Sequence, residues 1–203
     1  MFILYFRCKK HGTEEDVARF VNNCNRDKQT AMHIACERSF CDGVKILINY
    51  KADLSIKDHE GSTPLHLACG SCQDSAMEMQ TTIVVDNLTS HGAGVNAKDE
   101  NGLTPLMYAA KSGRTESAKI LLKRGAQLQA KDLKGLTALH HAARNYQGKF
   151  IKMIIKQGMP VDIKDKKQLT AMHHAISGTD QKCLDILALH TFIPSLPPVK
   201  NMK

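Results

Sequence analysis

The chain has 203 residues, of which 42% are hydrophobic, and its formal net charge is +8 at pH 7. This length and composition suit one elongated domain, and because no stretch of about 18 apolar residues occurs, the sequence predicts no membrane insertion. The seven cysteines show no spacing typical of a disulfide framework, so a reducing compartment is expected, cytoplasmic or also nuclear.

Residues 1–29 are expected to form a degenerate N-terminal capping repeat. From Asp16 to Val21 the apolar residues fall on one side of a predicted helix, whereas Arg7 stands where later units have a small residue. A polar, irregular end unit is typical of repeat arrays, because no neighbour covers it. Met1 falls inside this unit, which indicates a fragment or a divergent isoform.

From Thr30 onward one hexapeptide, Thr-x-Leu/Met-His-x-Ala, returns at a nearly fixed interval. Successive copies are separated by 33, 41, 33 and 33 residues. The copies are TAMHIA from Thr30, TPLHLA from Thr63, TPLMYA from Thr104, TALHHA from Thr137 and TAMHHA from Thr170. A period of this length indicates units that bury their apolar faces by stacking on one another.

Each period predicts a turn, a helix, a loop and a second helix. Before the hexapeptide, a Lys-Asp pair is followed by a glycine three residues after the aspartate in three units, as at Asp132 and Gly135. This spacing indicates a tight turn. The threonine suits a helix N-cap, and a proline at the next position is compatible with the first helical turn. About seventeen residues later, apolar residues at spacings of three and four, such as those around Leu121, predict a second helix.

These residues, their order and their period resemble the ankyrin repeat, whose Thr-Pro-Leu-His-x-Ala signature recurs here over about residues 25–190. The resemblance implies an all-α solenoid of stacked helix-turn-helix units with short β-hairpin-like loops. Five units would occupy residues 30–190, and a Pro-containing tail would occupy residues 191–203. The resemblance also implies that the histidine of each unit joins the threonine hydroxyl and nearby backbone in a structural network. Its members would be Thr30, His33, Thr63, His66, Thr104, Thr137, His140, Thr170 and His173, with Met107 replacing histidine in the third unit.

The second interval is eight residues longer than the others, and the excess lies at about residues 70–82. The expected second helix of this unit is Ile83–Leu88. The inserted residues are either a tolerated loop or an extra helical turn, or else a contact element particular to this protein.

Charge is unevenly distributed along the chain. Residues 103–167 hold 14 Lys and Arg against 4 Asp and Glu, whereas residues 1–102 carry a net charge of −3. This asymmetry predicts a partner with an acidic segment, although lysines on outer helix faces are also ordinary solubilising surface. The cations expected to contribute are Lys111, Arg114, Lys134, Arg144, Lys149, Lys164, Lys166 and Lys167. The predicted partner-binding residues are Lys111, Lys134, Arg144, Tyr146, Lys166 and Lys167, because arginine and aromatic residues dominate binding hot spots.

No catalytic residue, cofactor site or metal site is predicted. Histidines of successive units would lie about 10 Å apart, too far for a shared zinc ion. The pair Cys69-x-x-Cys72 would lie at the end of a first helix, where the helix dipole disfavours a thiolate. The chain also lacks phosphate-binding, nucleophile-elbow and metal-helix motifs.

Two further features carry alternatives. In ankyrin repeats an asparagine at the position of Asn96, with a leucine eight residues upstream, is a target for β-hydroxylation; the alternative is an ordinary turn residue. Pro194-x-x-Pro197 fits a polyproline II ligand, and the alternative is a solvated chain end.

We therefore expect a non-catalytic scaffold or adaptor, a monomer that binds another protein and not nucleic acid. Two alternatives stay open. One is a regulator similar to the inhibitors of Rel-type transcription factors, which are also short ankyrin arrays. The other is the ankyrin segment of a larger enzyme or ion channel.

Overall fold

The computed structural model describes residues 14–70, 77–176 and 181–192, and within these ranges it is helical with no β-strand. After α2 (Glu14–Val21), the helices come in five pairs. The pairs are α3 (Ala31–Glu37) and α4 (Cys41–Asn49), α5 (Pro64–Gly70) and α6 (Glu78–Ser90), α7 (Pro105–Ser112) and α8 (Thr115–Lys123), α9 (Ala138–Arg144) and α10 (Gly148–Lys156), and α11 (Ala171–Ile176) and α12 (Gln181–Phe192). The all-α solenoid predicted from the sequence is confirmed.

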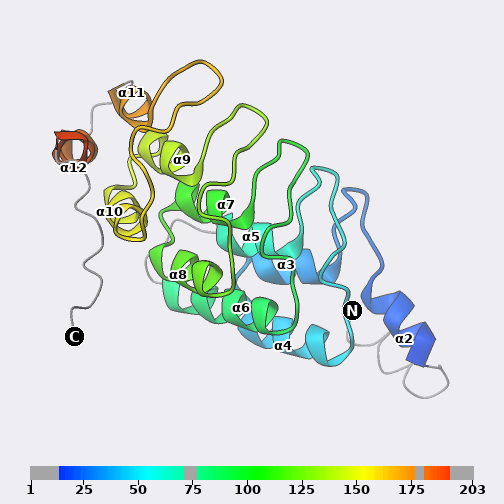
Figure 1. The fold of residues 1–203 in the computed structure, drawn as a ribbon. Coiled ribbons are helices and arrows are strands. Elements are labelled where there is room, and N and C mark those ends of the chain that lie inside the picture. The colour runs from blue at the N-terminus through cyan, green and yellow to red at the C-terminus, as the bar shows by residue number, and fades with distance from the viewer. Residues whose placement is uncertain (1–13, 71–76, 177–180, 193–203) are drawn as a thin grey trace, which may run out of the picture.

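The pairs stack in chain order. The first helices α3, α5, α7, α9 and α11 form one row, the second helices form another, and the long loops between pairs project from one edge (Figure 1). Each first helix packs against the next first helix and against its own second helix. Among the described residues, no helix is long and apolar enough to cross a membrane.

Sequence-local signals explain where the first helices begin. Thr30, Thr104 and Thr137 are N-cap residues with extended backbone, and α5 and α11 begin directly after Thr63 and Thr170. The starts of these five first helices were therefore predicted to the residue, because cap and turn chemistry act within a few residues.

The core is one continuous cluster that runs through all five pairs. Side chains from Met32 in α3 to Leu187 in α12 contribute to it, and most of its leucines and isoleucines are fully buried. Full burial of such a side chain stabilises the fold by about 1.5–3 kcal/mol. Since each pair buries its apolar face against its neighbours, each pair depends on the adjacent pairs for its stability.

Part of the insertion forms an extra helical turn, which was one of the alternatives predicted from the sequence, whereas the expected start of the second helix at Ile83 was wrong. Helix α6 begins at Glu78 rather than at Ile83, so residues 78–82 form an extra helical turn and do not separate the two helices. Three side chains of α6, those of Thr82, Thr89 and Ser90, donate hydrogen bonds to carbonyls one turn earlier within the helix. The remaining inserted residues, 71–76, lie outside the described part of the chain.

Candidate functional site

One aspartate carboxylate closes each loop that projects from the edge. Asp132 Oδ1 accepts hydrogen bonds from the backbone N–H groups of Lys134 and Leu136, both at 2.8 Å. Asp58, Asp99 and Asp165 make the same two bonds in their own loops. In the first three of these turns, in chain order, the glycine adopts a positive φ, 76° at Gly61, 77° at Gly102 and 81° at Gly135. The loop tips are therefore fixed by local bonds.

Neighbouring loop tips are also bonded to one another. The backbone N–H of Leu133 donates to the carbonyl of Asn101 at 3.0 Å, and that of Lys166 donates to the carbonyl of Lys134 at 3.1 Å. A hydrogen bond of the same kind links Glu100 to Glu60. The tips form a continuous edge whose side chains are held at a fixed spacing, so little ordering is needed when a partner binds.

A second ladder of bonds uses lysine side chains. Lys98 Nζ donates to the carbonyl of Lys131 at 3.2 Å, and Lys131 Nζ donates to the carbonyl of Lys164 at 3.1 Å. Lys57 makes the equivalent bond to Lys98 at 2.8 Å. These three ammonium groups join successive loops, so part of the basic charge serves the array itself.

The histidine of each hexapeptide links its own helix start to the next unit. His140 Nδ1 lies 3.2 Å from the backbone nitrogen of Thr137 and 2.8 Å from its Oγ1, and Nε2 lies 3.3 Å from the carbonyl oxygen of Leu169. A carbonyl only accepts, so Nε2 carries the proton and Nδ1 accepts. Burial lowers the pKa of His140, which keeps the ring neutral. Equivalent bonds form at His33 and His66.

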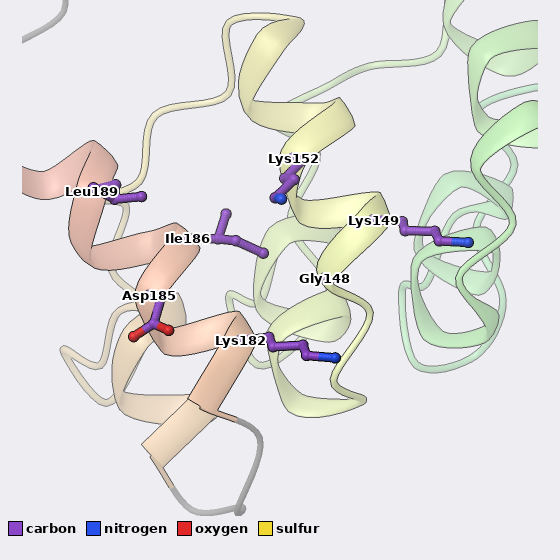
Figure 2. A pocket seen from close by; sticks show the side chains of 7 residues that line it. All are labelled: Gly148, Lys149, Lys152, Lys182, Asp185, Ile186 and Leu189. Carbon is purple, nitrogen blue, oxygen red and sulfur yellow. The ribbon is translucent and has the colours of Figure 1, made fainter.

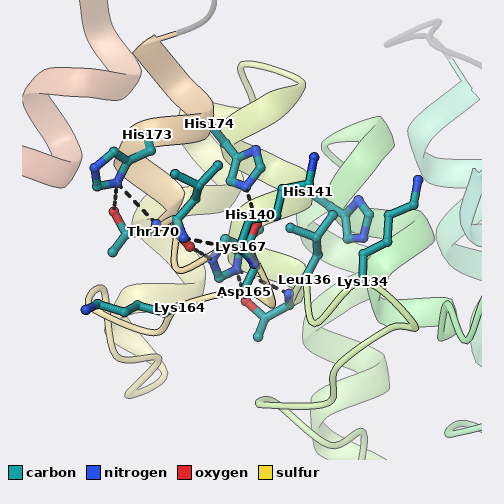
Figure 3. A network of polar contacts seen from close by, with 12 residues as sticks. Lys134, Leu136, His140, His141, Lys164, Asp165, Lys167, Thr170, His173 and His174 are labelled. Carbon is teal, nitrogen blue, oxygen red and sulfur yellow. Dashed lines mark hydrogen bonds and ion pairs between the residues drawn. The ribbon is translucent and has the colours of Figure 1, made fainter.

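The third and fifth units depart from this arrangement. Met107 is buried where the others have histidine, and Thr104 Oγ1 is buried without a hydrogen-bond partner among the described residues. His173 bonds Thr170 through Nδ1, at 3.2 Å to the backbone nitrogen and 2.8 Å to Oγ1, as Figure 3 shows. It is exposed, because no further unit follows in the described part of the chain.

In the last three units, the residue after the histidine position forms a contact that the sequence analysis missed. His141 Nε2 lies 3.0 Å from Asp132 Oδ2. His174 Nε2 lies 2.9 Å from Asp165 Oδ2 (Figure 3). In the third unit Tyr108 OH donates to Asp99 Oδ2 at 3.0 Å. In each case the carboxylate that closes the loop also holds the first helix, nine residues later in the chain.

Burial and hydrogen bonding have opposing effects on the pKa values of these groups. Burial lowers the pKa of His141, although the adjacent Asp132 carboxylate works against this effect. Burial tends to raise the pKa of Asp165, but hydrogen bonds from the Leu169 backbone and from His174 hold it below its ordinary value. Asp165 is therefore ionised at neutral pH, and His141 is kept neutral by its surroundings.

The predicted partner-binding cations lie on two levels of the loop side of the stack. Lys134, Lys166 and Lys167 are exposed at the loop tips. Lys111 and Arg144 are exposed in the last turns of α7 and α9, three residues after the side chains that bond the loop aspartates, and so share a helix face with them. The Lys111 ammonium lies 5.3 Å from the centre of the Tyr108 ring.

Tyr146 lies beyond the end of α9, in the connection to α10. It is 42% exposed and has a φ of 58°, in the left-handed region where the equivalent residue of the preceding unit is Gly113. A bulky residue rarely adopts this conformation, because its Cβ approaches the following carbonyl.

Two cations assigned to the basic surface do not belong there. Arg114 is only 4% exposed, because it is the N-cap residue of α8 and is packed inside the stack. Lys149 lies on α10 in the second row of helices, beside a surface depression of about 340 Å³ between α10 and α12 (Figure 2). The exposed lysines of α8 and α10, including Lys123, Lys152 and Lys156, form a separate outer surface.

Asn96 joins two successive loops. Its Oδ1 accepts from the backbone N–H of Gln127 at 2.8 Å, and its Nδ2 donates to the carbonyl of Gly125 at 3.0 Å. Asn22, in the equivalent position of the N-terminal unit, accepts from the backbone N–H of Asp53 at 2.9 Å. The amide at this position therefore has a structural role in two units.

Within the described ranges, no three His, Cys, Asp or Glu side chains are placed to share a metal ion. Cys36 and Cys69 occupy equivalent buried positions, and burial raises the pKa of both thiols. Both are therefore poor nucleophiles. Cys72, the second member of the Cys-x-x-Cys pair, lies outside the described residues.

A family model of ankyrin repeats, described as three copies, matches residues 4–79, 60–132 and 128–194. The chain belongs to the ankyrin repeat family. Ankyrin repeats are non-catalytic modules for protein–protein interaction, and this coarse function applies to the chain. The family assignment agrees with the stacked pairs, the capping threonines and the histidine bonds described above.

Curated relatives share the repeats over about half of the chain. Rabankyrin-5 of Homo sapiens is 33% identical over 100 residues, which is 49% of this chain and 8% of the relative. The B-cell lymphoma 3 protein homolog of Mus musculus is 30% identical over 107 residues, 53% of this chain and 23% of the relative. Neurogenic locus notch homolog protein 1 of Xenopus laevis is 27% identical over 132 residues, 52% of this chain and 5% of the relative. The matched region is thus a small part of each of these longer proteins.

Proposed function

We propose that this ankyrin array is a scaffold or adaptor that binds an acidic segment of another protein along its basic loop edge. The segment would lie across the tips carrying Lys134, Lys166 and Lys167 and would reach the helix ends carrying Lys111 and Arg144. Tyr146 is proposed as an aromatic anchor next to this surface.

One observation carries the proposal. Among the described residues, none of Lys134, Lys166, Lys167 and Arg144 takes part in an ion pair, although all are exposed. By contrast, on the outer row of helices Lys119 pairs with Glu116 at 2.6 Å and Arg124 with Asp86 at 3.2 Å. The carboxylates nearest the loop cations, such as Asp132 and Asp165, are buried and already accept several hydrogen bonds. The positive charge at the tips is therefore available to a partner.

The test compares two triple variants with the same change in net charge. Lys134→Glu, Lys166→Glu and Lys167→Glu reverse the tips, and Lys123→Glu, Lys152→Glu and Lys156→Glu reverse the outer surface. Proximity labelling with the wild-type chain in its native cell identifies partners, and each purified partner is then titrated with both variants. The tip variant is expected to bind at least about tenfold more weakly at low salt, with the outer variant close to wild type. Equal affinities for all three proteins would contradict the proposal.

The partner proteins identified by proximity labelling also distinguish the proposal from its two alternatives. A Rel-type transcription factor among the direct partners would support the regulator. Attachment of the repeats to an enzyme or channel domain in the natural transcript would support the larger protein; the curated relatives are all much longer than the matched region.

The remaining expectations are also proposals. We propose that the protein is in the cytoplasm or nucleus, which the buried, unbridged thiols of Cys36 and Cys69 support, and that it is a monomer. Hydroxylation of Asn96 would add one oxygen atom, which mass spectrometry of the protein from its native cell would detect. The boundaries at residues 29, 30–190 and 191–203 stay a proposal as well.

A further inference from the structure

The surface depression of about 340 Å³ between α10 and α12 lies on the outer row of helices (Figure 2). It is lined from Gly148 to Lys152 on α10 and from Lys182 to Leu189 on α12, and we call it the α10–α12 groove. Ile186 forms the floor of the groove and points towards α10. A Cβ at position 148 would lie 3.3 Å from Ile186 Cδ1, so a side chain there would fill this end of the groove. The equivalent residues of the earlier second helices all have side chains: Cys41, Thr82 and Thr115.

The two lysines of α10 that line the groove lack the acidic neighbour found in other second helices. In α8, Lys119 pairs with Glu116 at 2.6 Å. The equivalent residues of α10 are Lys152 and Lys149, which are both exposed and, among the described residues, take part in no ion pair. Like charges three residues apart on a helix repel each other. Opposite charges stand at these two positions in α4 and α12 as well: Asp42 with Lys45, and Lys182 with Asp185.

Helix α12 adds one more ammonium group and one carboxylate to the groove. These belong to Lys182 and Asp185, and Asp185 Oδ1 accepts a hydrogen bond from Gln181 Nε2 at 2.9 Å. The lining side chains therefore carry three positive charges and one negative charge, a net charge of +2. A phosphate monoester carries about −1.5 to −2 charges at pH 7 and offers three acceptor oxygens. It matches this charge more closely than a single carboxylate does.

The other end of the groove is apolar. Leu189 is 64% exposed, although the equivalent residues of the four earlier second helices are all polar. These residues are Asn49, Ser90, Lys123 and Lys156. In Figure 2, Leu189 lies at the opposite end of the groove from Lys182, with Ile186 between them. A ligand that fills the groove therefore needs an anionic group and an apolar group.

The shape of the groove favours a segment of polypeptide. The groove is open to solvent, because most of the side chains that line it, among them Lys152 and Leu189, are exposed. Small molecules bind in sites that enclose most of their surface, whereas a chain segment can continue beyond an open groove. Lys182 and Ile186 are separated by about 6 Å along the axis of α12. In an extended chain, side chains two positions apart point to the same face and lie about 6–7 Å apart.

We propose that the α10–α12 groove binds a phosphorylated segment of a partner protein. The phosphate is held between Lys182 and the two lysines of α10, at the Gly148 end. An apolar side chain two positions away in the segment rests on Ile186 and Leu189. The groove is on the outer row of helices and the loop tips project from another edge (Figure 1), so this site does not depend on the proposed acidic partner.

The test titrates the full chain with short synthetic peptides and follows the fluorescence anisotropy of a label on the peptide. The probes are phosphoserine-alanine-leucine and leucine-alanine-phosphoserine, both with blocked ends, so that either chain direction is sampled. At low salt, the better of the two should bind at least about tenfold more tightly than its unphosphorylated form. Replacing the leucine of this probe by serine should weaken binding several-fold. Equal affinities for the phosphorylated and unphosphorylated probes would overturn the proposal.

Matched variants locate the binding site. Lys152→Glu gives α10 the same order of charges as Lys182 and Asp185 in α12, so the fold should keep its melting temperature while most of the preference for phosphate is lost. Lys156→Glu makes the same change in charge on α10 outside the lining of the groove, and should bind the probe as the wild type does. Leu189→Ser should weaken binding of the probe with leucine but not of the probe with serine.

Two further results would also contradict the proposal. An equal loss of affinity in Lys152→Glu and Lys156→Glu would show a general attraction between charges and no defined site. Binding to vesicles of phosphatidylcholine and phosphatidic acid that Lys152→Glu abolishes, without any binding of the phosphorylated probes, would assign the groove to a lipid surface. The triple variant of the loop tips should bind the phosphorylated probe as the wild type does, which separates this test from that of the acidic partner.

Discussion

Exchanging the residue at the hexapeptide histidine position between the third and fourth units should shift stability in opposite directions. The two substitutions are Met107→His and His140→Met. Each places in one unit the residue that the other unit has naturally, within the same buried surroundings. We expect the first to stabilise the fold and the second to destabilise it.

The magnitude follows from the bonds gained and lost. In the third unit Thr104 Oγ1 is buried without a partner among the described residues, and a buried unsatisfied hydroxyl costs about 1–3 kcal/mol. A histidine at 107 would bond this hydroxyl as His140 bonds Thr137 at 2.8 Å, and would add about 0.5–1.5 kcal/mol through a carbonyl of the next unit. Loss of the buried methionine removes about 1.5–3 kcal/mol. The net gain is about 1 kcal/mol, with a loss of similar size for His140→Met.

Calorimetry on the two variants and the wild type measures these changes. A shift of 1 kcal/mol corresponds to about 2–4 °C in melting temperature for a chain of this size. Far-ultraviolet circular dichroism before heating controls for the native fold. A lower melting temperature for Met107→His, together with an unchanged one for His140→Met, would refute the role assigned to the histidine bonds.

Three further predictions concern pH and backbone conformation. Burial lowers the pKa of several histidines, so the unfolded state binds more protons than the folded state below about pH 6.5. The contribution of these histidines to the free energy of unfolding should be constant above that pH, and below it should fall by about 1.4 kcal/mol per pH unit for each residue as the pH approaches its folded-state pKa. A urea midpoint that is the same at about pH 7.5 and 5.5 would contradict this prediction. The residues are His33, His66, His140 and His141. Gly135→Ala should lower the free energy of unfolding in urea by about 2 kcal/mol, because φ is 81° and the new Cβ would lie 2.8 Å from the Lys166 backbone nitrogen. Gly125→Ala is the control: φ is 88° but no atom lies within 4 Å of the new Cβ, so the loss should be only about 1 kcal/mol. Equal losses for the two variants would exclude the contact with Lys166 as the cause. Tyr146→Gly should raise the free energy of unfolding by about 1 kcal/mol by relieving the positive φ, while Tyr146→Ala should not, and a partner that uses the ring should bind both variants more weakly.

The parts of the fold that could be predicted from sequence depend on local chemistry. Glycine turns, capping threonines and the spacing of apolar residues act within a few positions, so the helix starts after Thr63 and Thr137 were placed correctly. The start of α6 was not, because its N-cap residue is Met77, whose side chain makes no capping hydrogen bond and gives no capping signal at that position. Two turns also use a non-glycine residue at positive φ, Lys28 and Gln168, where the surrounding loop bonds impose the conformation.

The candidate site was harder to predict, because it depends on contacts across the fold. The bond from His141 to Asp132 forms only when the loop folds back over its own helix, and the sequence signal, a spacing of nine residues, has meaning only in that context. The count of charged residues located the basic half of the chain. It did not show that the basic side chains of this half are divided between the loop edge and the outer row of helices. Arg114 is inside the stack and Lys149 is on the outer row of helices, and neither position follows from composition.

The salt dependence of partner binding tests the central claim most directly. The dissociation constant of a captured partner is measured between about 50 and 300 mM salt, for the wild type and for both triple lysine variants. If the loop tips attract an acidic segment, affinity for the wild type falls steeply with salt, the tip variant loses most of this dependence, and the outer variant retains it. A dependence that is the same for the tip variant and the wild type would contradict the account.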